Sequence, residues 1–367
     1  MAHSERTPGR RLAASFTRGI AVALLLASAA AIPTRQTVAA SEPTLVVANW
    51  KAYGSDTPYA IKGFEAICHC KVVHQYFDSE QGLINLLRTG GVGHIDVALP
   101  NLAYVQPAIQ QGLIQPISVS RLSSYNSLYP ALRALPDDKS GGAVYGVPWM
   151  WGTTSLWYNP QIVKGSPNSW AALWDSTYKG KMSFYDDPTT AIMTAALYLH
   201  ENPYHPDLSK VQAALIRQKQ LDVSLWTSWD DWQKLYNSKQ IVIGNVWSGP
   251  AGSAAAAGHP IRYVIPKEGA VGWVDNWTIV KNAPHPDLAY QWINYMISTA
   301  FQVRYANDLA DEPPDPSNSQ VLGKISSHVA TTIMLHPEWL KSLVLQRAIP
   351  QATLRAWTQT WEIVKAS

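Results

Sequence analysis

The chain has 367 residues, of which 47% are hydrophobic and 15% are charged, a composition typical of a folded globular protein with room for two domains. The formal net charge is +3, but residues 1–40 hold five Arg and one Glu, so the remainder carries 24 basic against 25 acidic residues. The remainder is therefore nearly neutral. A net charge near zero gives no reason to expect nucleic acid or an acidic membrane surface as a partner, since these bind strongly basic proteins.

The N-terminal segment has the pattern of a secretory signal peptide. A basic region containing Arg10 and Arg11 precedes an apolar run over residues 20–31, and a run of small residues ends at Ala40. We expect residues 1–40 to be a signal peptide cleaved near Ala40, so that the mature protein is exported to the periplasm. No later segment has the roughly 18 consecutive apolar residues of a membrane-spanning helix.

Strands and helices alternate after this leader. The predicted elements are a strand over 45–49, a helix over 58–66, a strand over 71–77, a helix over 80–88, a strand over 94–100 and a helix over 103–111. Such alternation predicts a mostly parallel sheet covered by helices.

The two cysteines lie within the first of these blocks, as Cys68-His69-Cys70. A disulfide is possible in an exported protein, but a single intervening residue predicts a strained and labile ring. A metal site would need a distant fourth ligand, and the sequence offers no such pattern. We therefore expect two partly buried thiols without a function.

Residues 145–152 are rich in aromatic residues interrupted by Gly and Pro, and we take this segment as the boundary before a second α/β block. The elements predicted beyond it are a strand over 153–159, a helix over 170–174, a strand over 182–185, helices over 189–199 and 229–236, strands over 241–247 and 276–280, an amphipathic helix over 287–298 and a loop over 312–316. Helices are expected to close the chain.

Two α/β blocks joined by two crossings predict two lobes with a ligand cleft between them. The expected divisions are a signal peptide over 1–40, the first part of lobe 1 over 41–148, lobe 2 over 149–275, a return to lobe 1 over 276–315, and C-terminal helices over 316–367 that pack across the lobes.

One short segment carries the strongest chemical signal, because Trp273 stands two residues before Asp275. In an extended segment these side chains point to the same face. A flat aromatic surface beside a negative charge is suited to holding an organic cation. Tryptophan is more often a packing residue, and with 16 of them in the chain most must be structural.

A shared position supports the functional interpretation. Ligands of α/β sheets collect at the carboxyl ends of strands. The residues at or just past such predicted ends are Trp50, Asn101, Asp187, Trp247 and Asp275. We therefore expect one common site.

At these residues the chain resembles the bacterial periplasmic spermidine/putrescine-binding proteins, the substrate-binding components of polyamine ABC transporters. The resemblance covers essentially the whole mature chain. Its markers are Asn49-Trp50 with Tyr53, Ile95-Asp96-Val97 with Leu99-Pro100, Val147-Pro148-Trp149, Ser169-Trp170, Tyr178-Lys179-Gly180, Asp186-Asp187, Pro266-Lys267-Glu268-Gly269 and Trp273-Val274-Asp275.

The resemblance implies the two-lobed, cluster-type periplasmic-binding-protein fold and a function in transport. It implies capture of an amine-containing small molecule by hinge closure, delivery to an inner-membrane ABC permease, action as a monomer, and no cofactor, metal or enzymatic activity. By position, the implied aromatic walls are Trp50, Tyr53, Trp247 and Trp273, the carboxylate anchors are Asp187 and Asp275, and the polar contacts are Asn101 and Gln351.

Two positions depart from the family pattern. Ala52 and Thr190 stand where the family commonly places carboxylates. Because an unpaired buried ammonium costs several kcal/mol, the resemblance with these departures predicts a shorter ligand, a ligand with one cation, or one with a polar tail.

Two other classes of function remain open. The same fold could hold a mono-amine, a quaternary amine, an aminophosphonate, a sugar or ferric ion, although tryptophan walls argue against a bare metal. An enzyme is the remoter alternative, because the sequence has no nucleophile elbow, phosphate loop or zinc-protease motif. Asp186-Asp187 could form an acid/base pair, but adjacent residues of a strand face opposite ways.

Overall fold

The computed structural model describes residues 42–308 and 315–367. The predicted signal peptide and most of the proline-rich loop over 312–316 lie outside this described part of the chain. No helix within it is long and apolar enough to cross a membrane.

The strands largely follow the predicted alternation. They are β1 Thr44–Asn49, β2 Lys71–Tyr76, β3 Val97–Ala98, β4 Ile114–Gln115, β5 Lys139–Ser140, β6 Ala143–Val144, β7 Val147–Tyr158, β8 Met182–Tyr185, β9 Asp222–Trp226, β10 Ile243–Trp247, β11 Arg262–Val264, β12 Ala270–Val280, β13 Asp315–Pro316 and β14 Leu343–Leu345.

The α-helices lie between these strands and at the end of the chain. They are α1 Pro58–Cys68, α2 Glu80–Leu86, α3 Leu102–Gln110, α4 Pro130–Arg133, α5 Pro188–Tyr198, α6 Leu208–Lys219, α7 Trp229–Asn237, α8 Ser248–Ala256, α9 Pro286–Met296, α10 Thr299–Asn307, α11 Ser327–Thr332 and α12 Gln351–Ala366.

The two crossing strands, predicted over 153–159 and 276–280, are longer than expected and run over Val147–Tyr158 and Ala270–Val280. Two other predicted elements differ in length or type. The strand expected over 94–100 shrinks to Val97–Ala98, because the backbone N–H groups of His94 and Ile95 both donate to the carbonyl of Gly91 and hold that segment in a turn. The helix expected at Trp170–Trp174 is a 3₁₀ helix that begins at the Ser169 cap.

The main sheet has twelve strands, and its order runs β2-β1-β3-β12-β7-β10-β8-β9. Strands β7 and β12 are the longest and pair antiparallel with each other. The C-terminal half of β12 also pairs with β3, whereas the C-terminal half of β7 pairs with β10. These two strands are therefore the crossings between a lobe built on β2-β1-β3 and a lobe built on β10-β8-β9.

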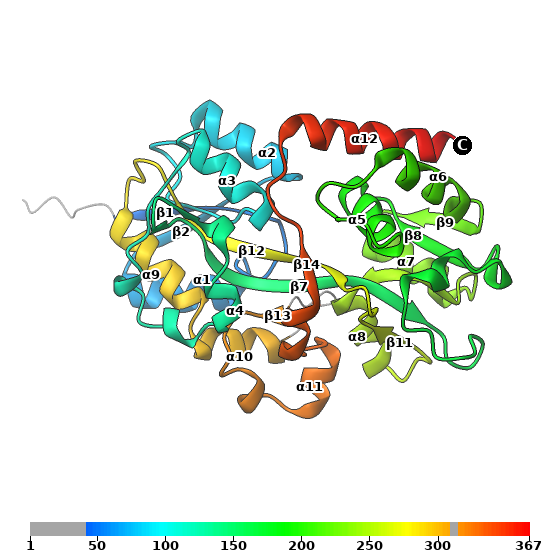
Figure 1. The fold of residues 1–367 in the computed structure, drawn as a ribbon. Helices are drawn as coiled ribbons and strands as arrows, with labels where there is room; N and C mark the ends of the chain where they lie inside the picture. Colours follow the sequence, from blue (N-terminus) through cyan, green and yellow to red (C-terminus); the bar gives the residue numbers. More distant parts are fainter. Residues whose placement is uncertain (1–41, 309–314) are drawn as a thin grey trace, which may run out of the picture. The chain divides into compact units, whose positions relative to one another are not determined.

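Each lobe keeps the parallel pairing that the alternation predicted. β1 is parallel to β2 and β3 in one lobe, and β8 is parallel to β9 and β10 in the other. The carboxyl ends of β1 and β3, and those of β8, β9 and β10, therefore share an edge within each lobe. α12 packs on α5 and α6 and adds Trp357, Trp361 and Val364 to the hydrophobic core there (Figure 1).

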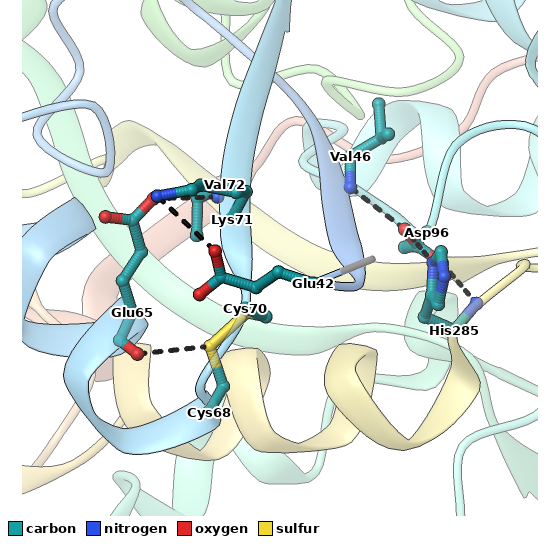
Figure 2. The surroundings of a disulfide bond; sticks show 9 residues. All are labelled: Glu42, Val46, Glu65, Cys68, Cys70, Lys71, Val72, Asp96 and His285. Carbon is teal, nitrogen blue, oxygen red and sulfur yellow. Dashed lines mark hydrogen bonds and ion pairs between the residues drawn. A yellow bond between two sulfur atoms is a disulfide. The ribbon is translucent and has the colours of Figure 1, made fainter. Parts of the chain in front are cut away.

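The prediction of free thiols is wrong, because Cys68 and Cys70 form a disulfide (Figure 2). His69 ends α1 in the left-handed conformation, with φ 52° and ψ 47°, and this sharp turn brings the two Cα atoms to 5.2 Å. That separation lies within the range that a disulfide spans without backbone movement. Cys70 is fully buried, and the side chain of Glu65 accepts a hydrogen bond from the nearby Val72 N–H at 3.0 Å.

Candidate functional site

The carboxylate of Asp275 lies at a break in the regular pairing of β12 with β7. The register of the two strands shifts between Asp275 and Asn276, as in a β-bulge. Bulges of this kind re-aim side chains and are frequent beside functional sites. Asp275 is 7% exposed, and its Oδ2 accepts from the Tyr53 hydroxyl at 2.5 Å while its Oδ1 accepts from the Asn101 amide at 3.0 Å.

Burial and these hydrogen bonds act in opposite directions on Asp275. Removal from water raises the pKa of its carboxyl to about 6, whereas the bonds from Tyr53 and Asn101 favour the ionised form and limit the rise. A nearby cation would favour the ionised form further. The structure thus joins three of the predicted residues in one hydrogen-bonded group.

Tyr53 is held by the loop that follows β1. Asn49, the last residue of β1, donates to the hydroxyl of Ser55 at 2.6 Å, and Ser55 in turn contacts the His74 ring at 3.0 Å. Both Asn49 and Ser55 are fully buried, so this pair fixes the loop against β2. Tyr53 also packs edge-to-face on Trp149, with ring centroids 5.7 Å apart.

Trp50 and Ala52 lie in the same loop. Trp50 is half-buried and rests edge-to-face on Phe77 at 4.6 Å. Ala52 is exposed and has a positive φ of 60°, and its N–H donates to the carboxylate of Asp56. Within the described part of the chain, neither Trp50 nor Ala52 is hydrogen-bonded to the Asp275 carboxylate.

Asn101 caps α3 in addition to contacting Asp275. Its Oδ1 accepts from the Ala103 N–H at 3.1 Å, as expected for an N-cap residue, which leaves its Nδ2 for Asp275. An isolated β-bridge also joins Asn101 to Asp275. Because Asn101 follows β3, one residue links the carboxyl edge of the first lobe to the crossing strand β12.

The indole of Trp273 lies close to a glycine of the other crossing strand. Trp273 pairs with Gly152 of β7, and a Cβ atom at Gly152 would stand 2.2 Å from Cζ2 of the indole. Only glycine allows so close an approach. The half-buried indole is therefore fixed on the strand pair that carries Asp275.

Trp247 belongs to an aromatic cluster at the carboxyl edge of the second lobe. Its ring makes edge-to-face contacts with Tyr185 at 5.1 Å and with Trp226 at 5.0 Å. These residues end the neighbouring strands β10, β8 and β9. The sequence interpretation missed Trp226 because it overlooked the strand Asp222–Trp226, which alternation of the apolar Val223 and Leu225 with Ser224 marks only weakly.

Asp187 is the N-cap of α5 and also belongs to the second lobe. Its Oδ1 accepts from the Thr190 N–H at 2.7 Å. Desolvation raises the pKa of Asp187, against the hydrogen bonds from Thr190. Its neighbour Asp186 turns away and accepts from the Trp361 indole at 2.6 Å, so the two carboxylates do not form an acid/base pair.

The glutamine that reaches this region is Gln346. Its Nε2 donates to the fully buried Thr190 hydroxyl at 3.2 Å, and its backbone N–H donates to the carbonyl of Gly272, next to Trp273. Gln351, the glutamine predicted from the sequence, is exposed at the first position of α12. Gln346 directly follows β14, a three-residue strand that the sequence pattern did not reveal.

Two further groups, Glu80 and Tyr104, were missing from the predicted site. Glu80, the first residue of α2, accepts from the Asn101 backbone N–H at 3.0 Å. The pKa of the Tyr104 hydroxyl is raised by burial and also by the charges of Glu80 and Asp187. Tyr104 therefore lies within electrostatic reach of carboxylates from both lobes.

A cavity of about 110 Å³ lies elsewhere, between α7 and α8. Trp229, Trp232, Tyr236 and His259 are among its lining residues, and none of the predicted site residues lines it. Within the described part of the chain, no group of three or more His, Cys, Asp or Glu side chains is arranged to hold a metal ion.

Two long crossing strands between parallel lobes, with aromatic and acidic residues at the strand ends, define the two-lobed fold of solute-binding proteins. The family of bacterial extracellular solute-binding proteins matches residues 60–330. Since this match covers most of the chain, the chain belongs to that family. It is a solute-binding protein and not an enzyme.

The chain is similar to several characterised proteins. It is 29% identical over 318 residues to the spermidine/putrescine-binding periplasmic protein of Escherichia coli, covering 86% of this chain and 89% of the relative. It is 26% identical over 368 residues to a putrescine/cadaverine-binding protein of Pseudomonas aeruginosa, covering 94% and 98%.

A solved structure confirms the fold. The spermidine/putrescine ABC transporter substrate-binding protein of Streptococcus pneumoniae superposes with a TM-score of 0.75 at 20% identity, over 89% of this chain and 99% of that one.

Proposed function

We propose that this chain is the periplasmic substrate-binding protein of an ABC importer and that it captures a polyamine. Binding between the lobes would favour the hinge-closed form, which a membrane permease then recognises. The similarity to periplasmic polyamine-binding relatives supports this class of ligand.

The observation that carries the proposal is the environment of Asp275. This carboxylate is 7% exposed and has two hydrogen-bond donors, and no Lys, Arg or His of the described residues is among the groups that act on it. A ligand ammonium would supply the missing positive charge and would receive a charge-assisted hydrogen bond, roughly twice as strong as a neutral one. We assign Asp275 as the principal anchor.

The aromatic residues supply the walls of the proposed site. Trp273 is fixed over Gly152, Trp247 is braced by Tyr185 and Trp226, and Trp50 lies in the loop that carries Tyr53. A cation over such a ring gains roughly 0.5–2 kcal/mol, depending on how far the site is desolvated. Several rings can therefore hold an alkyl diamine without many polar contacts.

The polar residues of the second lobe would hold the other end of the ligand. Asp187 is the acidic candidate, and the Gln346–Thr190 pair next to it is the polar one. Ala52, which is exposed, and Thr190, which is buried, have no carboxylate group. They stand at the two positions where spermidine-type sites have one. We therefore propose a preference for a short diamine such as putrescine over spermidine, and Gln346 as the late glutamine contact in place of Gln351.

Calorimetric titration of the purified mature protein tests the proposal. We expect putrescine to bind, spermidine to bind more weakly, and glucose and tetramethylammonium to bind least. Asp275→Asn should weaken putrescine binding at least tenfold, which corresponds to about 1.4 kcal/mol.

Asp222→Asn is the matched control. Asp222 also has a buried carboxylate oxygen, but it lies at the amino end of β9, at the other end of the strand from the aromatic cluster. This variant should bind as the wild type does. Preferential binding of a sugar, or equal affinity of Asp275→Asn and wild type, would refute the proposed ligand class or the anchor respectively.

A further inference from the structure

Glu80 occupies an unusual position for a carboxylate at the start of a helix. Ser79 caps α2, and the side chain of Glu80 turns toward the loop that precedes α3. Its Oε1 accepts from the Asn101 backbone N–H at 3.0 Å, while its Oε2 is buried and has no hydrogen-bond partner. A buried oxygen without a donor is costly for an ionised carboxylate but acceptable for a carboxylic acid.

Asn101 connects Glu80 to the proposed anchor. Its backbone N–H donates to Glu80, and its side-chain amide donates to Asp275, which also accepts from Tyr53. Two carboxyl groups from α2 and β12 are thus held by one asparagine. No Lys or Arg of the described residues is among the groups that act on this pair.

The electrostatics of the pair follow from this geometry. Burial, and secondarily the charge of Asp275, raise the pKa of Glu80 well above its ordinary value, and the Asn101 N–H only partly opposes them. On the α3 side stands the Tyr104 hydroxyl, whose pKa is raised by burial and by the charges of Glu80 and Asp187. Two acids coupled as Glu80 and Asp275 are titrate as a pair.

We propose that Glu80 is the proton store of the binding site: it holds a proton in the ligand-free protein and releases it to solvent when a ligand ammonium binds beside Asp275. This inference rests on the proposed function, because it requires a cationic ligand at Asp275. In this role Glu80 does not contact the ligand. It makes the affinity of the site for the ligand depend on pH. The step balances as the exchange of one bound proton for one ammonium group.

The exchange has a measurable consequence for affinity. The slope of log affinity against pH equals the number of protons released, so a full proton gives about a tenfold gain per pH unit. The affinity of the wild type for putrescine should therefore continue to rise between pH 6.5 and 8, at pH values above the pKa of Asp275. In Glu80→Gln, which keeps an oxygen to accept from Asn101 but cannot ionise, the rise should level off near pH 7.

Calorimetry with putrescine at pH 7, in two buffers of different ionisation enthalpy, counts the protons directly. We expect the wild type to release about half to one proton per ligand and Glu80→Gln to release less than half as many. Asp222→Asn is the control, because burial raises the pKa of Asp222 to about 8 without any link to the ligand, and its proton count should match the wild type.

An infrared measurement on the wild type requires no variant at Glu80. A protonated-carboxyl band that remains at pH 7.5 in the ligand-free protein should weaken when putrescine is added. Burial also raises the pKa of Asp138, Asp222 and Asp315, but Glu80 is the one of these four carboxyls coupled to Asp275, so the shares of the other three should cancel in the difference between the ligand-bound and ligand-free spectra.

The outcomes separate the two proposals. Tight putrescine binding with no proton release, or equal release by wild type and Glu80→Gln, overturns the role of Glu80 and leaves polyamine capture standing. Failure of the folded wild type to bind any polyamine between pH 6 and 8.5 overturns both.

Discussion

The side-chain amide of Asn101 donates to the carboxylate of Asp275 at 3.0 Å, although the two residues are 174 positions apart in sequence. One caps the helix after β3, and the other sits at the bulge of β12. Since a hydrogen bond to the ionised form lowers the pKa of an acid, this contact and the bond from Tyr53 limit how far burial raises the pKa of Asp275.

Asn101→Ser tests that contact without removing the helix cap, because serine is also a good N-cap residue. The shorter side chain loses the bond to Asp275, so the pKa of Asp275 should rise above about 6. Putrescine affinity is lost as pH falls through that pKa, so the midpoint of the loss should move upward. Calorimetric titrations at pH 5.5, 6.5, 7.5 and 8.5 measure it.

At pH 8.5 the serine variant should bind within about threefold of the wild type, since Asp275 is then largely ionised in both proteins. Parallel pH profiles for the two proteins would show that the amide has no influence on the anchor.

Gly152→Ala should damage the aromatic wall. The new Cβ would meet Cζ2 of Trp273 at 2.2 Å, so the indole must move away. We expect an affinity loss of about tenfold and a destabilisation of about 1–3 kcal/mol, as is usual for overpacking. Calorimetry and thermal unfolding measure the two effects.

Gly323→Ala is the matched control for this substitution, because nothing lies within 4 Å of the Cβ added there. Its affinity and melting temperature should match the wild type. Wild-type affinity in Gly152→Ala would remove Trp273 from the site.

Asp222→Asn should stabilise the protein at alkaline pH. Burial raises the pKa of Asp222 from 3.8 to about 8. The folded state therefore binds a proton more tightly than the unfolded state, and its stability is greatest below pH 4 and falls as pH rises toward 8. Asparagine cannot ionise, so the variant does not lose this stability at high pH. The melting temperature of Asp222→Asn should therefore exceed that of the wild type by at least about 2 °C at pH 8.5.

Near pH 4 the melting temperatures of wild type and Asp222→Asn should converge, since the aspartate is then neutral in both states. A constant difference between the two proteins across this pH range would contradict a titrating origin.

Removal of the disulfide should have a small effect on stability and none on binding. The bond closes a loop of about three residues, for which chain entropy gives only about 1.5 kcal/mol. Cys68→Ala with Cys70→Ala, or reduction of the wild type, should lower the melting temperature by a few degrees. Putrescine affinity should not change, because the bond precedes β2, at the opposite end from the strand edge that carries Tyr53 and Asn101. A loss of affinity on reduction would disprove this separation.

The sequence predicted the parallel lobes and their crossings because apolar strands and amphipathic helices have distinct periods. It also singled out Asn101 and Asp275 by their position at predicted strand ends, and Tyr53 through the family resemblance. The structure joins these three residues by hydrogen bonds.

Other features depend on contacts that no local pattern encodes. Glu80 looks like an ordinary first-turn acid, and only the fold brings it to Asn101. Gln346 follows a three-residue strand whose partner is about seventy positions earlier in the chain. The disulfide was missed because the left-handed turn at His69 cannot be inferred from spacing alone.

That short bridge also simplifies oxidative maturation. The chain has two cysteines, and both are in the same bond. Within a single molecule there is consequently one pairing to make and no wrong one to undo, so refolding after export should need an oxidant but no disulfide-shuffling catalyst.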